Sequence, residues 1–356
     1  MTHQETYDPT LDAPPAAPPN EDYYRQPGAP RRNGRARGLG VALVLVGILL
    51  LAFQIFGRGI PFGSAVGAIT LIDKTLPGNR IELVAAASDV EVRTWDGAQI
   101  RVEATQRGGA RGDYTIDVTQ SGDTVHVTES TRNFFSFFGS RSLSYRISVP
   151  KGAQADIKTA SGEIDVSGVG GAVSLNSVSG DVRASDLTGG LTVGTSSGEV
   201  TLHDIDGKLA VSTISGDVQL EDGKVDNVSV STTSGEVKLQ GVAGPLNLDS
   251  ISGDITVSDA QDGQLTISTT SGGVEYDGGL ARGGSNTVNS ISGDVELQLP
   301  EDSGFRLDAS TVSGDLDSDF DLQGGEQGRR ALSGVAGTGD TTLKIDTTSG
   351  SIHIRH

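Results

Sequence analysis

The chain has 356 residues, of which 50 are glycine, aromatic residues make up 4%, and cysteine is missing. Without cysteine, disulfide frameworks, thiolate metal sites and thiol catalysis are excluded. The net charge of −19 arises in residues 161–356, which hold 30 acidic and ten basic side chains. Because such a surface repels phosphates, we expect no nucleic-acid partner.

Residues 1–37 contain seven of the twelve prolines and almost no β-branched residues. A segment of this composition buries too little apolar surface to offset its chain entropy. We therefore predict a disordered, proline-rich tail. It ends in the basic cluster Arg31, Arg32, Arg35 and Arg37.

Residues 38–57 carry no charge and are apolar on all sides of a helix. Twenty helical residues rise roughly 30 Å, the thickness of a bilayer core, which predicts a transmembrane helix followed by a linker over 58–65. Four arginines precede the span, so the tail is expected in the cytoplasm and the rest of this single-pass protein outside the cell membrane. A cleaved signal peptide is the rival interpretation.

Residues 66–160 contain alternating segments typical of strands, such as Ile100–Ala104 and Ser144–Val149. A solenoid needs an atypical end that hides its first coil, so we predict degenerate coils that form a capping region. This region also contains four clustered phenylalanines, Phe134, Phe135, Phe137 and Phe138. They belong either to the cap or to an exposed loop that inserts into the outer membrane leaflet or a partner.

Residues 161–356 are a repeat in which an alternating strand, a Ser-Gly corner, an acidic residue and a second strand follow one another. This pattern predicts an all-β fold, a β-solenoid of stacked coils. The last interval, 36 residues, is interpreted as two repeats with one eroded copy around Gly324–Gly339. The corner serines are Ser161, Ser179, Ser197, Ser215, Ser234, Ser252, Ser271, Ser292, Ser313 and Ser349.

The corner residues are predicted to have a structural role. The residue two positions before each corner serine is always Ser or Thr. We expect these hydroxyls to hydrogen-bond along the stack, and the corner glycine to adopt a positive φ.

Two features of the corner alternate between successive repeats: the residue before the serine is small or aliphatic, and the acid after the glycine is Glu or Asp. This alternation favours a coil of two repeats over a coil of one, with Asp181 stacked near Asp217. Strand parity places the aliphatic residues outward, but β-branched apolar side chains are usually buried, so we favour a corner that tucks them into the core. They are Val178, Ile214, Ile251, Ile291 and Val312.

A membrane span, the segment Val149–Gly152, the segment Thr159–Val166 and the serial Ser-Gly-Asp/Glu copies together resemble a large bacterial family. Its members are β-strand repeat proteins of unknown function named "putative adhesin". The resemblance covers residues 66–356 and implies a protein of the cell envelope. The family has no established catalytic residues to transfer.

We find no catalytic, cofactor-binding or metal-binding residues in the sequence. Gly194–Gly198 matches a nucleophile elbow, but that elbow needs a following helix. The histidines His3, His126, His203, His353 and His356 lack zinc spacing. Stacked acids would repel by about 1 kcal/mol per pair. We expect solvated turn carboxylates, with weak divalent-cation association or specific calcium sites as alternatives.

The sequence thus predicts a non-enzymatic, membrane-anchored, extracytoplasmic β-solenoid. It would act as an adhesin-like binding or structural surface for a protein or cell-surface ligand. The alternative is an envelope-stress sensory or regulatory protein that signals through residues 1–37. The two differ in their response to deletion of residues 1–30, which would abolish signalling but spare surface binding. The oligomeric state stays open.

Overall fold

The computed structural model describes residues 68–356 apart from 109–113 and 132–141. The tail, the transmembrane helix, the linker and the phenylalanine cluster expected from the sequence lie outside the described residues. Within the part that is described, no helix has the length and apolar character needed to cross a membrane. The regular elements of that part are β-strands, which confirms the all-β prediction.

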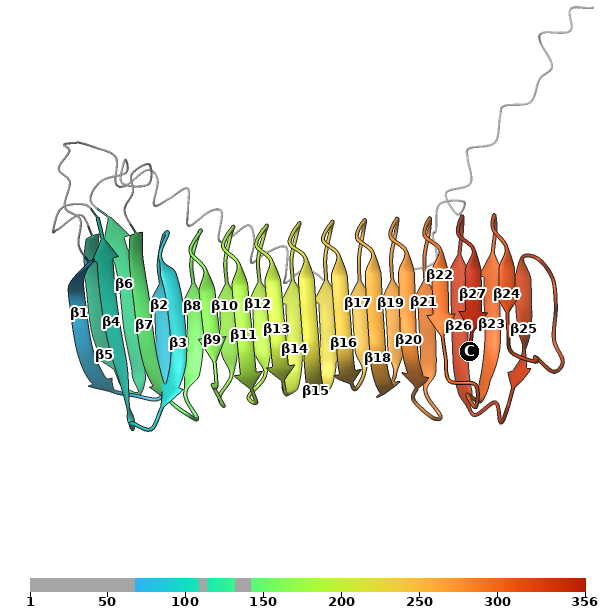
Figure 1. The fold of residues 1–356 in the computed structure, drawn as a ribbon, viewed down its shortest axis with the longest axis horizontal. Helices are drawn as coiled ribbons and strands as arrows, with labels where there is room; N and C mark the ends of the chain where they lie inside the picture. Colours follow the sequence, from blue (N-terminus) through green and yellow to red (C-terminus); the bar gives the residue numbers. More distant parts are fainter. Residues whose placement is uncertain (1–67, 109–113, 132–141) are drawn as a thin grey trace, which may run out of the picture. The chain divides into compact units, whose positions relative to one another are not determined.

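The strands form two sheets that run along the stack and share β15 (Figure 1). Sheet A contains, in spatial order, β1 (Ala68–Pro77), β4 (Gln99–Arg107), β7 (Ser142–Pro150), β3 (Asp89–Trp95), β9 (Ile164–Ser167), β11 (Val182–Leu187), β13 (Val200–Ile205), the first half of β15 (Val218–Ser231), β16 (Val237–Ala243), β18 (Ile255–Gly263), β20 (Val274–Leu280), β22 (Val295–Gln298), β27 (Ile352–Arg355) and β24 (Leu316–Ser318).

Sheet B contains, in spatial order, β5 (Tyr114–Ser121), β6 (Thr124–Thr131), β2 (Arg80–Val84), β8 (Gln154–Lys158), β10 (Val173–Asn176), β12 (Leu191–Gly194), β14 (Gly207–Ser212), the second half of β15, β17 (Leu246–Asp249), β19 (Leu265–Ser268), β21 (Ser285–Asn289), β26 (Thr341–Thr347), β23 (Phe305–Thr311) and β25 (Ala331–Ala336). In the central coils the chain alternates between the sheets, so each coil contributes one strand to each.

The coil is one repeat long. Val182 pairs with Val200 in the parallel ladder of β11 and β13, 18 residues apart. The backbone N–H of Glu199 donates to Oδ1 of Asp181 at 3.0 Å, so the Asp-type and Glu-type corners are stacked neighbours. The two-repeat coil with these corners on opposite edges is therefore wrong. The alternation of corner residues thus distinguishes successive coils that have the same backbone structure and the same length of one repeat.

The core is a set of aliphatic files that run along the stack between the two sheets. Alternate residues of each strand point inward, as the period of a strand requires. In sheet B one such file contains Leu175, Val193 and Val211, and in sheet A another contains Val182 and Val200, all of them buried. Burial of each Val or Leu side chain contributes roughly 1.5–3 kcal/mol, which explains how a chain with few aromatic rings forms a core.

Both ends of the stack depart from chain order. The coil β2–β3 lies between β6–β7 and β8–β9, and the coil β26–β27 lies between β21–β22 and β23–β24. The 36-residue interval therefore holds no eroded coil. It contains the antiparallel strand β25 and the strand β26, with which the chain enters the inserted coil β26–β27. Antiparallel strands end the stack, with β1 and β5 at one end and β25 at the other.

Candidate functional site

The Ser-Gly corners join each strand of sheet B to the following strand of sheet A. The hydroxyl residue two positions before the serine is buried, and its oxygen accepts the backbone N–H of the corner glycine. In one corner Gly216 N lies 2.9 Å from Thr213 Oγ1. The same bond recurs in eight of the other nine corners, and in the Ser313 corner Thr311 Oγ1 instead donates to Gly350 O of the neighbouring coil. These hydroxyls thus bond mainly within their own corner, and not along the stack as expected.

The corner glycines are required by close packing between coils. A Cβ on Gly216 would lie closer than 3.0 Å to the carbonyl oxygen of Gly198 in the preceding coil, and Gly198 meets Gly180 in the same way. Among the described corners, none of these glycines has a positive φ, so the conformational reason expected from the sequence is wrong. Absence of a side chain, and not backbone freedom, selects glycine here.

The aliphatic residues before the corner serines point into solvent. Because the hydroxyl residue before them is fixed inward by its bond to glycine, strand parity turns the next side chain outward. The expectation that the corner tucks them into the core is therefore wrong. The exposed fractions are 44% for Ile214, 51% for Ile251, 51% for Ile291 and 65% for Val312, while Val178 is half-buried. We call these four exposed residues the apolar file.

Along this edge, aliphatic residues and threonines alternate between coils that are neighbours in the stack, even where those coils are not consecutive in the chain. Ser349 N donates to Ile291 O and Ser313 N donates to Thr348 O, so Thr348 lies between Ile291 and Val312. The inserted coil therefore continues a pattern that the chain order breaks. Aliphatic members recur every second coil, roughly 10 Å apart. The residues along the edge are, in order, Ile214, Thr233, Ile251, Thr270, Ile291, Thr348 and Val312.

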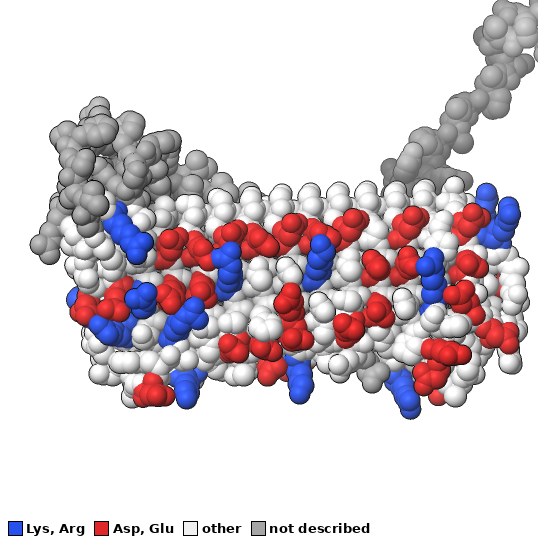
Figure 2. All heavy atoms as spheres, in the orientation of Figure 1, with Lys and Arg blue, Asp and Glu red and all other residues white. Residues whose placement is uncertain are grey.

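The acids after the glycines have structural partners. The Asp members accept a backbone N–H from the next coil, as Asp217 does from Glu236 at 2.9 Å and Asp254 from Gly273 at 2.8 Å. Some Glu members pair with bases: Glu236 lies 2.9 Å from Lys238. Figure 2 shows acidic side chains in rows along the stack, with single lysines and arginines between them. Hydrogen bonds and ion pairs thus relieve part of the expected repulsion.

The opposite corner, where sheet A returns to sheet B, carries aspartates in the left-handed backbone region. The four residues other than glycine that have positive φ among the described residues are Asp186, Asp204, Asp222 and Asp259, at 50–56°. Asp and Asn tolerate this conformation better than other side chains because they are short and polar.

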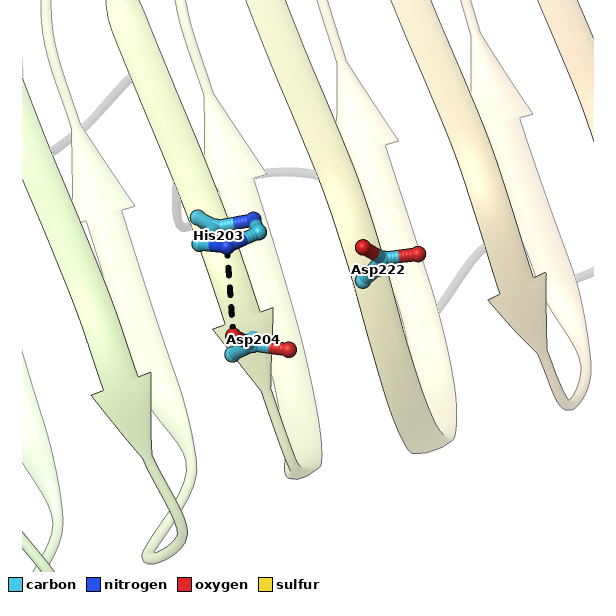
Figure 3. Close-up of side chains that lie close together, drawn as sticks. All are labelled: His203, Asp204 and Asp222. Atoms are coloured by element: carbon cyan, nitrogen blue, oxygen red, sulfur yellow. Dashed lines mark ion pairs between the residues drawn. The ribbon is translucent and has the colours of Figure 1, made fainter.

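Two of these aspartates lie beside His203 (Figure 3). His203 Nε2 is 3.2 Å from Asp204 Oδ2, and each of His203, Asp204 and Asp222 offers a ligand atom within 4.8 Å of the others. All three are exposed. Zinc spacing along the chain does not reveal this group, because Asp222 comes from the next coil. The available signal was the pair His203-Asp204 together with an 18-residue period, which brings Asp222 alongside.

The remaining histidines of the described chain do not join it. His126 pairs with Glu82 at 3.0 Å, and the ring of His356 packs edge-on against Phe320. His353 lies on β27, and His3 lies outside the described residues. The corner serine of the elbow-like segment, Ser197, stands between β12 and β13 with a strand and not a helix after it.

A polar groove of about 330 Å³ crosses the strands β3, β7 and β9 near one end of the stack. Its lining residue Glu91 pairs with Arg146 at 3.2 Å, and Arg93 beside the groove contacts the lining residues Glu91 and Asp165, each at 2.9 Å. The Arg93 hydrogen bond holds the pKa of Glu91 below its usual value. The groove is therefore an ion-pair cluster that bridges adjacent coils.

Glu129 is a largely buried carboxyl group at the end of β6. Ser88 Oγ donates to its Oε2 at 2.6 Å, and Tyr145 Oη lies 3.4 Å from the same oxygen. Burial raises the pKa of Glu129 and also that of Tyr145. The folded protein is therefore less stable when Glu129 is ionised at neutral pH, and it becomes more stable when Glu129 is protonated.

We expect Glu129→Gln to be more stable than the wild type at pH 8, because the amide keeps an acceptor for Ser88 without the buried charge. The advantage should shrink as the pH falls through the raised pKa and disappear below the usual value of 4.5. Urea unfolding from pH 8 to pH 4 measures the difference, with the exposed Glu275→Gln as control. An advantage that stays constant or grows toward acid pH would contradict this assignment.

These observations define a β-solenoid built of one-repeat coils, with glycine-packed corners on one edge and left-handed aspartates on the other. The chain belongs to the family described as Toastrack DUF4097, whose model matches residues 78–277 and 281–355. The resemblance inferred from the repeats, to bacterial proteins named "putative adhesin", is confirmed.

The matches among solved structures come from several bacteria. A "putative cell adhesion protein" from Clostridium sporogenes is 11% identical, with 82% of this chain and 99% of that chain covered and a TM-score of 0.22. A "putative lipid binding protein" from Parabacteroides distasonis is 14% identical, with 85% and 99% covered and a TM-score of 0.36. A "putative adhesin" from Bacteroides fragilis is 11% identical, with 82% and 98% covered and a TM-score of 0.34. A comparison with curated proteins finds no match.

Proposed function

We propose that the protein is a membrane-anchored, extracytoplasmic solenoid that acts as an adhesin-like binding surface of the bacterial envelope. The observation that carries the proposal is the apolar file. Of the five exposed large aliphatic side chains in the described residues, four lie in this single row. Apolar side chains gathered in one exposed place mark sites of interaction, whereas scattered ones need no explanation.

The edge favours an extended partner that lies along the stack. The corner serines next to the file are exposed, and the threonines between its members add hydroxyls at each intervening coil. A protein strand or a cell-surface polymer that follows the stack would meet the same apolar and hydroxyl groups every two coils. A binding surface therefore fits the edge better than a reaction centre does, because the buried polar groups of the corners are used in structural bonds.

The anchoring part of the proposal rests on residues 31–58. An uncharged span of 20 residues with four arginines before it and one after it supports a single-pass topology in which the solenoid faces outward. The solenoid would then present its edges outside the cell membrane.

The absence of cysteine allows both parts of the proposal to be tested by single labels. Thr233→Cys places a thiol between two members of the apolar file, and Thr192→Cys places one on the exposed face of β12. On intact cells, a membrane-impermeant maleimide that carries a photo-crosslinker should label both variants. Only the label at position 233 should then crosslink to a partner, and the crosslink should be lost when Ile214 and Ile251 are both changed to Thr.

That double variant should melt within a few degrees of the wild type, because exposed substitutions typically change stability by less than about 0.5 kcal/mol each. Val84→Thr, which removes the exposed aliphatic side chain outside the file, is the matched control and should keep the crosslink. Failure of both cysteines to label would overturn the outward topology. Equal crosslinking from position 192 would overturn the role of the file.

A further inference from the structure

We propose that His203, Asp204 and Asp222 form a binding site for a transition-metal dication of the zinc type. The site lies on the corner opposite the Ser-Gly edge, between the coils that contain β13 and β15. It does not depend on the proposed binding role of the apolar file.

The strand register and the backbone conformation bring the three side chains together. His203 pairs with Glu221 in the parallel ladder, so the following residues, Asp204 and Asp222, stack one coil apart. In a regular strand His203 and Asp204 would point to opposite faces. Because Asp204 has a φ of 50°, its carboxylate instead lies on the side of the imidazole. Asp222, with a φ of 56°, turns in the same way from the next coil.

The imidazole has the arrangement of a metal ligand. Its Nδ1 lies 3.2 Å from the carbonyl oxygen of Glu221, to which a protonated Nδ1 donates. That bond occupies Nδ1, so Nε2 is the ring nitrogen that can bind a metal. Histidine ligands in metalloproteins commonly donate their other ring N–H to a carbonyl or carboxylate in this manner. Nε2 faces Asp204 Oδ2, so a metal at this position would take the place of a shared proton.

The spacing of the donor atoms matches a tetrahedral ion. Bonds of about 2.0 Å in a tetrahedral zinc site separate two ligand atoms by about 3.3 Å. The 3.2 Å between His203 Nε2 and Asp204 Oδ2 corresponds to that separation. A carboxylate oxygen of Asp222 lies within 4.8 Å of the ligand atoms of His203 and Asp204, so Asp222 is the third ligand of the proposed set (Figure 3). A water molecule or a ligand atom would supply the fourth position.

The donor set selects the class of metal. Imidazole nitrogen suits zinc, nickel and copper, whereas calcium takes six to eight oxygen ligands. Only two of the four left-handed aspartates of this corner take part in the proposed site. Asp186 and Asp259 share the left-handed conformation, but each follows a serine, Ser185 and Ser258, and neither belongs to the group of ligand atoms within 4.8 Å of one another, although Ser185 pairs with His203. The combination of one histidine and two aspartates occurs at one pair of coils in the described chain.

Isothermal titration of the untagged full chain in detergent with Zn²⁺ tests the site. We expect binding of one equivalent that weakens at least tenfold in His203→Gln and in Asp222→Asn. Asparagine tolerates the left-handed conformation, so Asp222→Asn should keep the backbone and the melting temperature of the apo protein. His126→Gln and Asp259→Asn are the matched controls, since they remove a two-membered histidine–carboxylate pair and an isolated left-handed aspartate.

A second readout follows the imidazole directly. In protein with ¹⁵N-labelled histidine, Zn²⁺ should shift the ring-nitrogen resonances of His203 at one equivalent and leave those of His126 unchanged. Binding that survives His203→Gln, or that is lost equally in His126→Gln, would overturn the site. Displacement of Zn²⁺ by an equimolar amount of Ca²⁺ would also overturn it, because it would indicate diffuse attraction to the acidic surface.

Discussion

Replacement of Gly216 by alanine is expected to destabilise the solenoid by about 3 kcal/mol or more. The new Cβ would overlap the carbonyl oxygen of Gly198, and no side-chain rotation can relieve a contact between a Cβ and the backbone of the neighbouring coil. Overpacking inside well-packed proteins typically costs 1–3 kcal/mol when side chains can adjust, so a backbone overlap lies at or above the upper end. The two coils would have to separate at this corner.

Urea unfolding followed by circular dichroism measures this cost. Gly152→Ala is the matched control, because a Cβ on Gly152 meets nothing within 4 Å and its φ is not positive. The control should lie within about 0.5 kcal/mol of the wild type. Equal stability of Gly216→Ala and Gly152→Ala would show that the corner glycines are not required by packing between coils.

Deletion of residues 341–356 is expected to release two coils and not one. The deleted residues form β26 and β27, which lie between β21–β22 and β23–β24. Without them β24 loses its ladder partner, and β23 keeps only the antiparallel strand β25. We therefore expect residues 305–336 to lose protection, although they remain in the chain.

Hydrogen exchange with mass spectrometry resolves the two regions. Amides of β8 to β20 should keep their protection in the deletion variant, while those of β23 and β25 exchange at once. A larger deletion, of residues 301–356, should leave β8 to β20 equally protected, since none of these strands pairs with a strand of the removed part. Retained protection of β23 after the short deletion would mean that the last coil is not inserted.

Local chemistry predicted the strands and corners of the solenoid but not the length of the coil or the neighbours of each coil. The Ser-Gly step with alternating apolar residues requires two strands and a corner wherever it occurs, so the all-β solenoid could be predicted from the sequence. Ser313 and Ser349 stand in nearly the same local pattern, however, and nothing in that pattern tells which coil packs against Ser292. The insertion is decided by long-range pairing at the ends of the stack.

The errors at the corners have a common physical origin. The sequence shows the alternation of aliphatic and small residues, but these side chains lie on the surface. The length of the coil is set by backbone pairing between strands, which both types of side chain allow. Ile214 was expected in the core because of its residue type, yet the inward bond of Thr213 decides its direction. His203 gained its neighbours only through the register and through the positive φ of Asp204, neither of which residue type alone predicts.

The inserted coils also set the order in which the molecule can fold. In the centre, hydrogen-bonded partners such as Asp181 and Glu199 are 18 residues apart in the chain. At the ends the partners are far more distant: Asp294 and Ser351 are separated by 57 residues, and Asp89 and Glu163 by 74. Closing these longer loops costs about 1 kcal/mol more in chain entropy. Folding should therefore nucleate in the central coils and propagate outward. Each end should form last, when the inserted coil, β2–β3 or β26–β27, packs between two coils that are distant from it in the chain.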